Sequence, residues 1–242
     1  FYVVEWFLAD YRYVLLAWQT IFFFFAICPR SLIGEALAVE RYVAADDLEG
    51  ARKRLSWIVG RDTSQLSFAQ IRTAVLETLA ENLSDGVIAP LCFYALGGVP
   101  IMMAYKMINT LDSMIGYKDQ HYKDFGYFAA RILDDAANYI PSRLTALLML
   151  LVAPSRRAVR TVWRDARKHA SPNSGYPESA LAGILGVQFG GPNIYHGMLV
   201  EKPYIGTPIH AVTAQTLRRT IRIVIAVTLL ASLLVFLTYL YR

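Results

Sequence analysis

Residues 77–118 read ETLAENLSDGVIAPLCFYALGGVPIMMAYKMINTLDSMIGYK, and this stretch decides the fold. Its apolar centre is broken by Gly97, Gly98 and Pro100, and polar side chains crowd both of its ends. Polar groups are costly near lipid unless each has a partner or a function. A simple soluble helix has no need of the Gly-Gly-x-Pro break. The pattern therefore predicts a reaction site that is built around a broken apolar segment at a membrane surface.

The composition also indicates an integral membrane protein. The 242 residues are 55% hydrophobic and only 18% charged, with a mean hydropathy of +0.36. Soluble domains usually carry more charge than this. The clearest candidate span is the uncharged run IVIAVTLLASLLVFLTYLY at 223–241, which is long enough to cross a bilayer core as a helix. We therefore expect a C-terminal transmembrane helix at 223–241.

Three further apolar stretches are weaker candidates for spans. Residues 14–27 are marginal in length, and 144–153 are too short to span alone unless the helix extends back through Pro141. Residues 87–108 have the length but are interrupted, so we expect that they do not cross as one straight helix. The predicted fold class is mainly α, with little strand signal. We expect one polytopic integral membrane domain over 1–242, with polar loops on the cytoplasmic side.

The net charge of +5 is concentrated in one segment. Six basic residues fall within 156–168, and Asp165 is the only acid among them. This clustering is typical of a cytoplasmic loop, and it would also attract anionic lipid or an anionic substrate. No recognition motif accompanies the basic run, so no nucleic-acid partner is expected. The four histidines are scattered and predict no zinc site.

The polar segments have local signatures of helices and turns. A capping box at Ser67–Gln70 predicts a helix that runs to about residue 83. We also expect an amphipathic helix at 35–54 and helices at 104–115 and 125–138, the last ending or kinking at Pro141. Residues 171–177 are expected to form a loop, which a short alanine-rich helix follows. The glycine-rich run 183–191 is explained as well by close helix packing as by phosphate binding.

Three of these helices each place carboxylates and amides on one face. The three sets are Glu77 and Glu81, followed by Asn82, Ser84 and Asp85; Lys106, Asn109, Asp112 and Ser113; and Arg131, Asp134, Asp135 and Asn138. Hard oxygen ligands of this kind suit Mg²⁺ that is shared with substrate phosphates. One such set alone is more often a solvated surface. Three sets beside apolar segments favour a site, although no P-loop or Ser-His-Asp arrangement is present.

At these motifs the sequence resembles the CobD/CbiB family of cobalamin biosynthesis, the adenosylcobinamide-phosphate synthases. The resemblance covers about residues 30–242. It also leads us to expect that an N-terminal family segment is missing from this chain, which begins with Phe1. The matching motifs are GRDTS at 60–64, ENLSDG at 81–86, NTLDSMIGYK at 109–118, LDD at 133–135 with Asn138 and Arg143, SPNSGYPE at 171–178 and GGPN at 190–193.

The resemblance implies an ATP-dependent amide ligase that joins adenosylcobyric acid to aminopropanol or its phosphate. It implies Mg²⁺ as cofactor, ATP as co-substrate, and an active site on the cytoplasmic face of the inner (plasma) membrane. Whether the chain forms a homo-oligomer is left open. The alternatives are a non-catalytic membrane regulator on the same scaffold, as in AmpE-like proteins, and an Mg²⁺-dependent transferase acting on a phosphorylated lipid.

The resemblance assigns expected roles to seventeen residues. The acids Glu81 and Glu178 are candidates for the catalytic base. The expected metal ligands are Asp85, Asp112, Asp134 and Asp135. The expected substrate or phosphate ligands are Arg61, Asp62, Thr63, Asn82, Lys106, Asn109, Lys118, Asn138, Arg143, Asn173 and Asn193.

Overall fold

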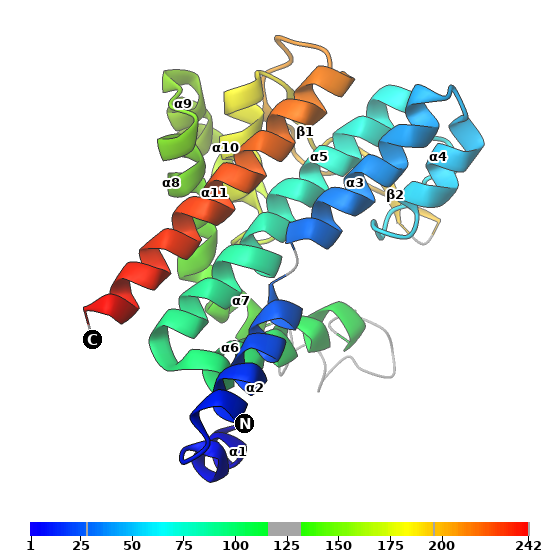
Figure 1. The fold of residues 1–242 in the computed structure, drawn as a ribbon. Helices are drawn as coiled ribbons and strands as arrows, with labels where there is room; N and C mark the ends of the chain where they lie inside the picture. The colour runs from blue at the N-terminus through cyan, green and yellow to red at the C-terminus, as the bar shows by residue number, and fades with distance from the viewer. Residues whose placement is uncertain (28, 116–131, 196, 242) are drawn as a thin grey trace.

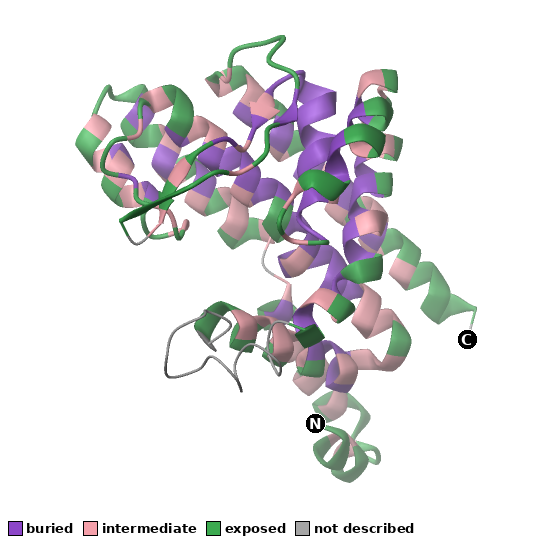
Figure 2. Ribbon diagram, turned by 180° about the vertical axis from the view of Figure 1, so that it is seen from behind, coloured by how far each residue is buried: buried purple, intermediate pink, exposed green. Residues whose placement is uncertain are grey.

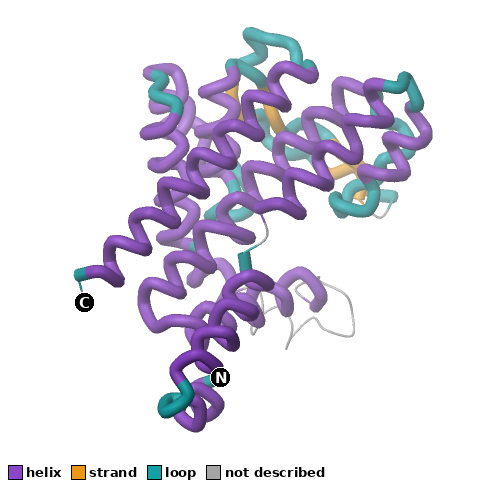
Figure 3. Tube along the Cα trace, viewed as in Figure 1, coloured by secondary structure: helices purple, strands orange, loops and turns teal. Residues whose placement is uncertain are grey.

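The computed structural model describes residues 1–27, 29–115, 132–195 and 197–241, and most of them are helical (Figures 1 and 3). In these ranges, three helical stretches are long and apolar enough to cross a membrane: Arg12–Ala44, Phe68–Met114 and Ala214–Leu240. The helix Tyr139–Val152 is apolar but shorter. The predicted fold class, a mainly α protein with membrane spans, is confirmed.

Most of the described elements are helices, and four very short strands precede the C-terminal helix in the sequence. Seven elements precede the undescribed residues 116–131, and ten follow them. They are α1 (Tyr2–Leu8), α2 (Arg12–Ala26), α3 (Pro29–Ala44), α4 (Leu48–Leu55), α5 (Phe68–Leu83), the π-helix η1 (Ser84–Ile88), α6 (Ala89–Ile115), α7 (Leu133–Ala137), α8 (Tyr139–Val152), α9 (Arg156–Asp165), the 3₁₀-helix η3 (Ala166–Lys168), α10 (Gly175–Leu185), β1 (Gln188–Phe189), β2 (Asn193–Tyr195), β3 (Met198–Val200), β4 (Ile205–Gly206) and α11 (Ala214–Leu240).

The core is centred on α10, which packs against α5, α8 and α9. Nearly every residue of α10 is buried, as the purple ribbon in Figure 2 shows. Small residues allow this close packing: a Cβ on Gly183 would lie only 2.4 Å from the Cα of Ala158 in α9. Gly186 then ends the helix with φ +70°, a left-handed conformation that favours glycine. Helix packing therefore accounts for the start of the glycine-rich run.

The predicted break in the apolar segment lies inside α6, at Gly97 and Gly98. Gly98 has φ +68° and ψ −157°, which a residue with a side chain rarely adopts. The second arm of α6 runs back beside the first: the rings of Phe93 and Tyr105 stack with centroids 4.8 Å apart. The Tyr105 hydroxyl oxygen lies 3.1 Å from the carbonyl oxygen of Asp85. This segment is therefore a helical hairpin, in agreement with the expectation that it does not cross as one straight helix.

Two of the predicted boundaries are wrong, and a local cap explains the first of them. The helix expected at 35–54 is two helices, α3 and α4. Asp46 between them has φ +57°, and the side chain of Asp47 caps α4 by accepting from the Gly50 N–H at 2.8 Å. The loop expected at 171–177 is shorter than predicted, because α10 begins at Gly175.

Other predicted helix boundaries are confirmed. The capping box at Ser67 and Gln70 is formed, and α5 ends at Leu83 as expected. The helix expected at 125–138 falls partly outside the described residues, and its described part is α7. After Asn138 the chain starts α8, and Pro141 lies in its first turn, where a missing N–H costs little. α8 therefore extends the apolar stretch 144–153 back through Pro141, as predicted.

The four strands pair as two antiparallel ladders, β1 with β4 and β2 with β3. Each ladder has only two or three residue pairs, which agrees with the weak strand signal of the sequence. The β1–β4 ladder packs against α10, and β1 also contacts α5. These ladders hold the turn at 190–193 and the β2–β3 hairpin close to α5.

Candidate functional site

A cavity of about 400 Å³ opens among η1, the second arm of α6, α7 and the loop before α10. We call it the acidic cavity, because carboxylates and amides dominate its walls. All four predicted metal ligands line it, although their motifs lie far apart in the sequence. The lining residues are Ile58, Glu81, Asn82, Asp85, Asn109, Asp112, Ser113, Asp134, Asp135, Asn138, Ser171, Asn173 and Ser174. The three polar helix faces therefore meet in one site, as the sequence predicts.

Amide side chains orient the acids of this cavity. Asn109 Nδ2 donates to Asp134 Oδ1 at 3.1 Å, and so links α6 to α7. Asn173 Nδ2 donates to the backbone oxygen of Asp135 at 2.8 Å, and so links α7 to the loop before α10. Burial raises the pKa of Asp134, although the hydrogen bond from Asn109 opposes this shift. A buried carboxylate whose donor is a neutral amide is suited to receive a cation.

Tyr105 ties the hairpin to the floor of the same cavity. Its hydroxyl donates to Asn138 Oδ1 at 2.8 Å and lies 3.1 Å from the backbone oxygen of Asp85. Tyr105 and Asn138 are both buried, so this contact is dry. Asp85 itself belongs to the π-helix η1, and such wide turns are frequent at functional sites. The hairpin break is therefore what brings η1, α6 and α7 together.

The donor set of the acidic cavity fits a hard cation. Within the described ranges, no three His, Cys, Asp or Glu side chains lie close enough together to form a ready-made metal site. Mg²⁺, however, usually keeps several waters and binds one or two carboxylates together with substrate phosphates. Aspartates on separate walls of one cavity suit that mode of binding. Magnesium ligation by these residues stays a prediction.

A second cavity, of about 160 Å³, adjoins the first. We call it the mixed-charge cavity, because both signs of charge line it. It shares Ile58, Glu81 and Asn82 with the acidic cavity. Its other lining residues are Val59, Gly60, Arg61, Glu77, Thr78, His169, Glu178, Tyr195 and Lys202.

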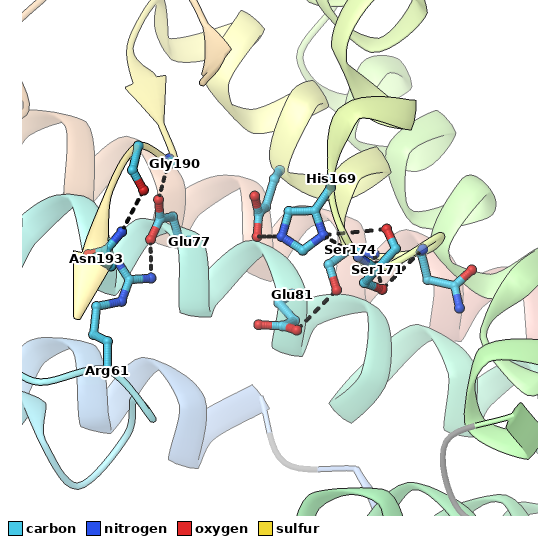
Figure 4. Close-up of polar contacts among 11 residues, drawn as sticks. Arg61, Glu77, Glu81, His169, Ser171, Ser174, Gly190 and Asn193 are labelled. Atoms are coloured by element: carbon cyan, nitrogen blue, oxygen red, sulfur yellow. Dashed lines mark hydrogen bonds and ion pairs between the residues drawn. The ribbon is translucent and has the colours of Figure 1, made fainter. Parts of the chain in front are cut away.

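Arg61 and Glu77 form a buried ion pair on one wall of the mixed-charge cavity (Figure 4). Glu77 Oε1 also accepts from the Gly190 N–H at 2.7 Å, and Arg61 Nη1 donates to Asn193 Oδ1 at 3.3 Å. Burial lowers the pKa of Arg61, but the charges of Glu77, Tyr195 and Glu178 and the hydrogen bond to Glu77 together raise it. Arg61 and Asn193 are therefore held by protein groups, and their predicted roles toward a substrate stay predictions.

The predicted catalytic acids also line this cavity. Ser174 Oγ donates to Glu81 Oε1 at 3.0 Å (Figure 4). Glu178 is buried, and its Oε1 lies 3.8 Å from His169 Nε2. Burial, together with the charges of Glu77 and Glu81, raises the pKa of Glu178 well above its usual range. The two candidate bases therefore face one small cavity.

His169 completes this wall. Its Nδ1 accepts from the Ser171 N–H at 3.0 Å, and its Nε2 lies 3.8 Å from Glu178 Oε1. Burial lowers the pKa of His169, which favours the neutral form. The sequence analysis missed His169, because its scattered position suggested no zinc site. Its one local signal is its place two residues before the motif at 171–178.

Several predicted ligands have structural partners instead. Asp62 is exposed, and its side chain accepts from the Ser64 N–H at 2.8 Å. Thr63 is buried and donates to the backbone oxygen of Arg52 at 3.0 Å. Asp62 and Thr63 line neither cavity, so the structure brings them to the site only as the turn that supports Arg61.

The predicted cations that the structure describes do not line the acidic cavity. Arg143 stacks on the rings of Tyr139 and Tyr176, with 3.5 and 4.1 Å to their centroids. Lys106 is half-buried and lines neither cavity. Lys118 lies outside the described residues. Lys202, which follows β3, does line the mixed-charge cavity, and no motif of the sequence identified it.

The chain is similar to known proteins over most of its length. Residues 1–224 match the family model described as CobD/Cbib protein. A cobalamin biosynthesis protein CobD of Klebsiella pneumoniae is 52% identical over 83% of this chain, which spans 64% of that protein. A protein of the same name in Geobacter metallireducens is 49% identical, over 91% of this chain and 69% of its own length. A cobalamin biosynthesis protein CbiB of Salmonella typhimurium is 50% identical, over 88% and 68%. No solved structure matches.

Proposed function

Because the chain belongs to the CobD/CbiB family of cobalamin biosynthesis proteins, we propose that this protein is an ATP-dependent amide ligase. It would join a propionate carboxyl of adenosylcobyric acid to aminopropanol or its phosphate. The product is adenosylcobinamide or adenosylcobinamide phosphate. The chain spans about two thirds of the length of the curated relatives it matches. The activity of the whole protein is therefore part of the proposal.

The proposed reaction has two steps. A carboxylate oxygen attacks the γ-phosphorus of ATP, the new O–P bond forms, and ADP leaves to give an acyl phosphate. The amine nitrogen then attacks the acyl carbon, the C–N bond forms, and the C–O bond to phosphate breaks. Neither step needs a covalent nucleophile from the protein. The protein must position the reactants and neutralise the phosphate charge.

The acidic cavity would hold the nucleotide phosphates. A bound Mg²⁺ would neutralise the charge of these phosphates. We assign Asp85, Asp112, Asp134 and Asp135 to hold it, because all four line this cavity. Amides such as Asn109 and Asn173 orient the acids and can donate to phosphate oxygens without adding negative charge.

The amine must lose a proton before or during its attack. Glu81 lies on the wall shared by the two cavities, and its carboxylate is oriented by Ser174. Glu178 lies in the adjoining cavity. We therefore assign Glu81 and Glu178 as the groups that accept this proton.

The observation that carries the proposal is that acids from three separate motifs line one cavity. The test is an assay of the full-length protein in detergent with ATP, Mg²⁺, adenosylcobyric acid and either amine. We expect phosphate release that depends on the amine, and a corrinoid product whose mass has increased by the amine less one water. Absence of amide product with both amines would refute the assignment.

The alternatives predict different outcomes in the same assay. A regulator on this scaffold would bind ligands without releasing phosphate. A lipid transferase would consume a phosphorylated lipid and ignore the corrinoid. None of the three relatives named above carries the name of a regulator. A non-catalytic relative could lack the four aspartates that we assign to the metal, but all four are present here.

We also propose that the protein lies in the inner membrane with both cavities open to the cytosol. ATP is cytosolic, and a strongly basic helix such as α9 is typical of a cytoplasmic segment. Ser64, three residues after Arg61, and Arg167, two residues before His169, are both exposed. The variants Ser64→Cys and Arg167→Cys should both react with a membrane-impermeant thiol reagent only in inside-out vesicles. Labelling of the two from opposite sides would contradict this orientation.

A further inference from the structure

We propose that the mixed-charge cavity is the amine subsite, with Glu178 and Glu81 facing the ammonium group and Lys202 facing an anionic phosphate at the other end. The proposed ligand class is a small primary amine that carries a phosphate. This inference rests on the proposed amide ligation. It adds where the amine binds, in which direction it lies, and which residue distinguishes the phosphorylated amine from the free amino alcohol.

The ammonium end is defined by Glu178, which needs a cation. Its carboxylate is buried, with 6% of the residue exposed, and it lies in the field of two other carboxylates, Glu77 and Glu81. Within the described part of the chain, the basic group within 4.0 Å of Glu178 is His169, and burial lowers the pKa of its ring. A buried carboxylate is unfavourable without a positive partner. A primary ammonium has three donors and can satisfy Glu178 and Glu81 together.

Among the described residues, no lysine or arginine pairs with Glu178 within 4.0 Å, although the charges of Lys202 and Arg61 partly oppose the rise of its pKa. Arg61, which lines the same cavity, is paired with Glu77 and also bonded to Asn193. Glu77 in turn accepts from Gly190. These groups satisfy one another, so the wall they form is complete before any ligand binds.

The anionic end is defined by Lys202. Its Nζ lies 4.8 Å from the centroid of the Tyr195 ring, and this cation–π contact holds the lysine side chain in place. Within the described ranges, Lys202 forms no ion pair of 4.0 Å or less with an acid. Tyr195 ends β2 and Lys202 follows β3, so the hairpin places both residues on the cavity wall. A positive group that is held by a ring and not by a carboxylate remains available to a phosphate.

The two ends fix the direction of the ligand. Glu81 and Asn82 line both cavities, so the ammonium lies at the boundary with the acidic cavity, where the activated carboxyl would be. There the ammonium gives one proton to Glu81, and the nitrogen lone pair forms the C–N bond as the C–O bond to phosphate breaks. The second proton of the nitrogen leaves with the departing phosphate. The phosphate tail of the amine points away from the aspartates, which would repel it.

The experiment compares two amines in full-length protein with the substitutions Lys202→Ala and Lys202→Arg. Loss of one charge-assisted contact costs about 1.5–3 kcal/mol, or about 10- to 100-fold. Lys202→Ala should therefore raise KM for aminopropanol phosphate by about that factor. KM for aminopropanol and for ATP should stay within about twofold, and Lys202→Arg should restore most of the loss. Lys53→Ala, which removes an exposed lysine outside both cavities, is the matched control.

Equal effects of Lys202→Ala on the two amines, or no effect on either, would overturn the subsite. A calorimetric titration with aminopropanol phosphate alone, without ATP or corrinoid, separates this test from the proposed reaction. Wild-type protein should bind the compound, and both Lys202→Ala and Glu178→Gln should weaken the binding at least about tenfold. If wild-type protein binds the compound in this way but forms no amide, the ligation fails and the subsite stands. If it forms amide and neither substitution alters binding, the subsite fails and the ligation stands.

Discussion

Buried acids are neutralised in different ways in the mixed-charge cavity and in the acidic cavity. Glu77, in the mixed-charge cavity, is paired with Arg61 and accepts from the Gly190 N–H. Asp134, in the acidic cavity, accepts from the neutral amide of Asn109. The first arrangement is complete within the protein and therefore serves the fold. The second leaves negative charge for a ligand, and we attribute function to it on that ground.

The largest effect should come from the aspartates that line the acidic cavity. Asp134→Asn or Asp112→Asn removes a charge with almost no change of shape. Losing one electrostatic contact to a transition state costs about 3–4 kcal/mol, so turnover should fall about 1,000-fold. Thermal stability and membrane insertion should be retained, because Asn can occupy the same space. Amide formation at saturating ATP and Mg²⁺ is the measurement.

The control for this charge removal is Asp46→Asn. Asp46 is exposed and has φ +57°, a conformation that Asn also tolerates. Its activity should match that of wild type. If Asp134→Asn and Asp112→Asn both keep near-normal turnover at low Mg²⁺, the acidic cavity does not hold the metal.

The next effect is on stability instead of turnover, and should follow from Glu77→Gln. The substitution leaves the buried Arg61 without its carboxylate, which typically costs about 3–5 kcal/mol. Glu40 offers a matched comparison, because it forms a similar pair with Arg72. The side chains of Glu40 and Arg72 are 14% and 21% exposed, against 7% and 13% for Glu77 and Arg61. Glu40→Gln should cost about 1 kcal/mol or less. Thermal unfolding in detergent measures both, and equal losses would contradict the distinction by burial.

The smallest effect concerns Asp165, a second acid that the protein neutralises. Burial raises its pKa, but the hydrogen bonds from Arg164, Lys168 and the Gly206 N–H outweigh burial and hold the pKa well below its usual range. The carboxylate therefore stabilises the fold above the unfolded pKa of about 3.9, and this contribution is lost as the pH falls through the folded value.

The test of this pH dependence is Asp165→Asn. At pH 7 it should lower the free energy of unfolding by about 1–2 kcal/mol, since a buried acceptor for Gly206 is weakened. The difference from wild type should shrink as the pH falls below about 4. A difference that grows on acidification would show that Asp165 is not held as the charged form.

The sequence predicts the parts of this site better than their assembly. The capping box at Ser67, the break at Gly97 and Gly98 and the helical spacing of the acids are local signals, and the structure contains all of them. The boundary between α3 and α4 was missed because it depends on one left-handed residue, Asp46, inside an otherwise helical pattern.

The long-range partners could not be read from the sequence. His169 and Lys202 reach the mixed-charge cavity through the loop before α10 and through the β2–β3 hairpin. Neither segment has a periodic pattern that fixes its position relative to α5. The pairing of Arg61 with Glu77 likewise depends on tertiary packing, although the two residues are only 16 positions apart and a predicted turn and cap lie between them.

The central claim is that these two cavities join a carboxyl group to an amine through an acyl phosphate. Adenosylcobyric acid with ¹⁸O in its reacting carboxyl tests it most directly, because the step transfers one carboxyl oxygen to phosphate. With the full-length protein, ATP, Mg²⁺ and aminopropanol phosphate, the account predicts one ¹⁸O atom in the released inorganic phosphate for each amide formed from fully labelled carboxyl. Amide formation with unlabelled phosphate, or phosphate release without any amide, would contradict it.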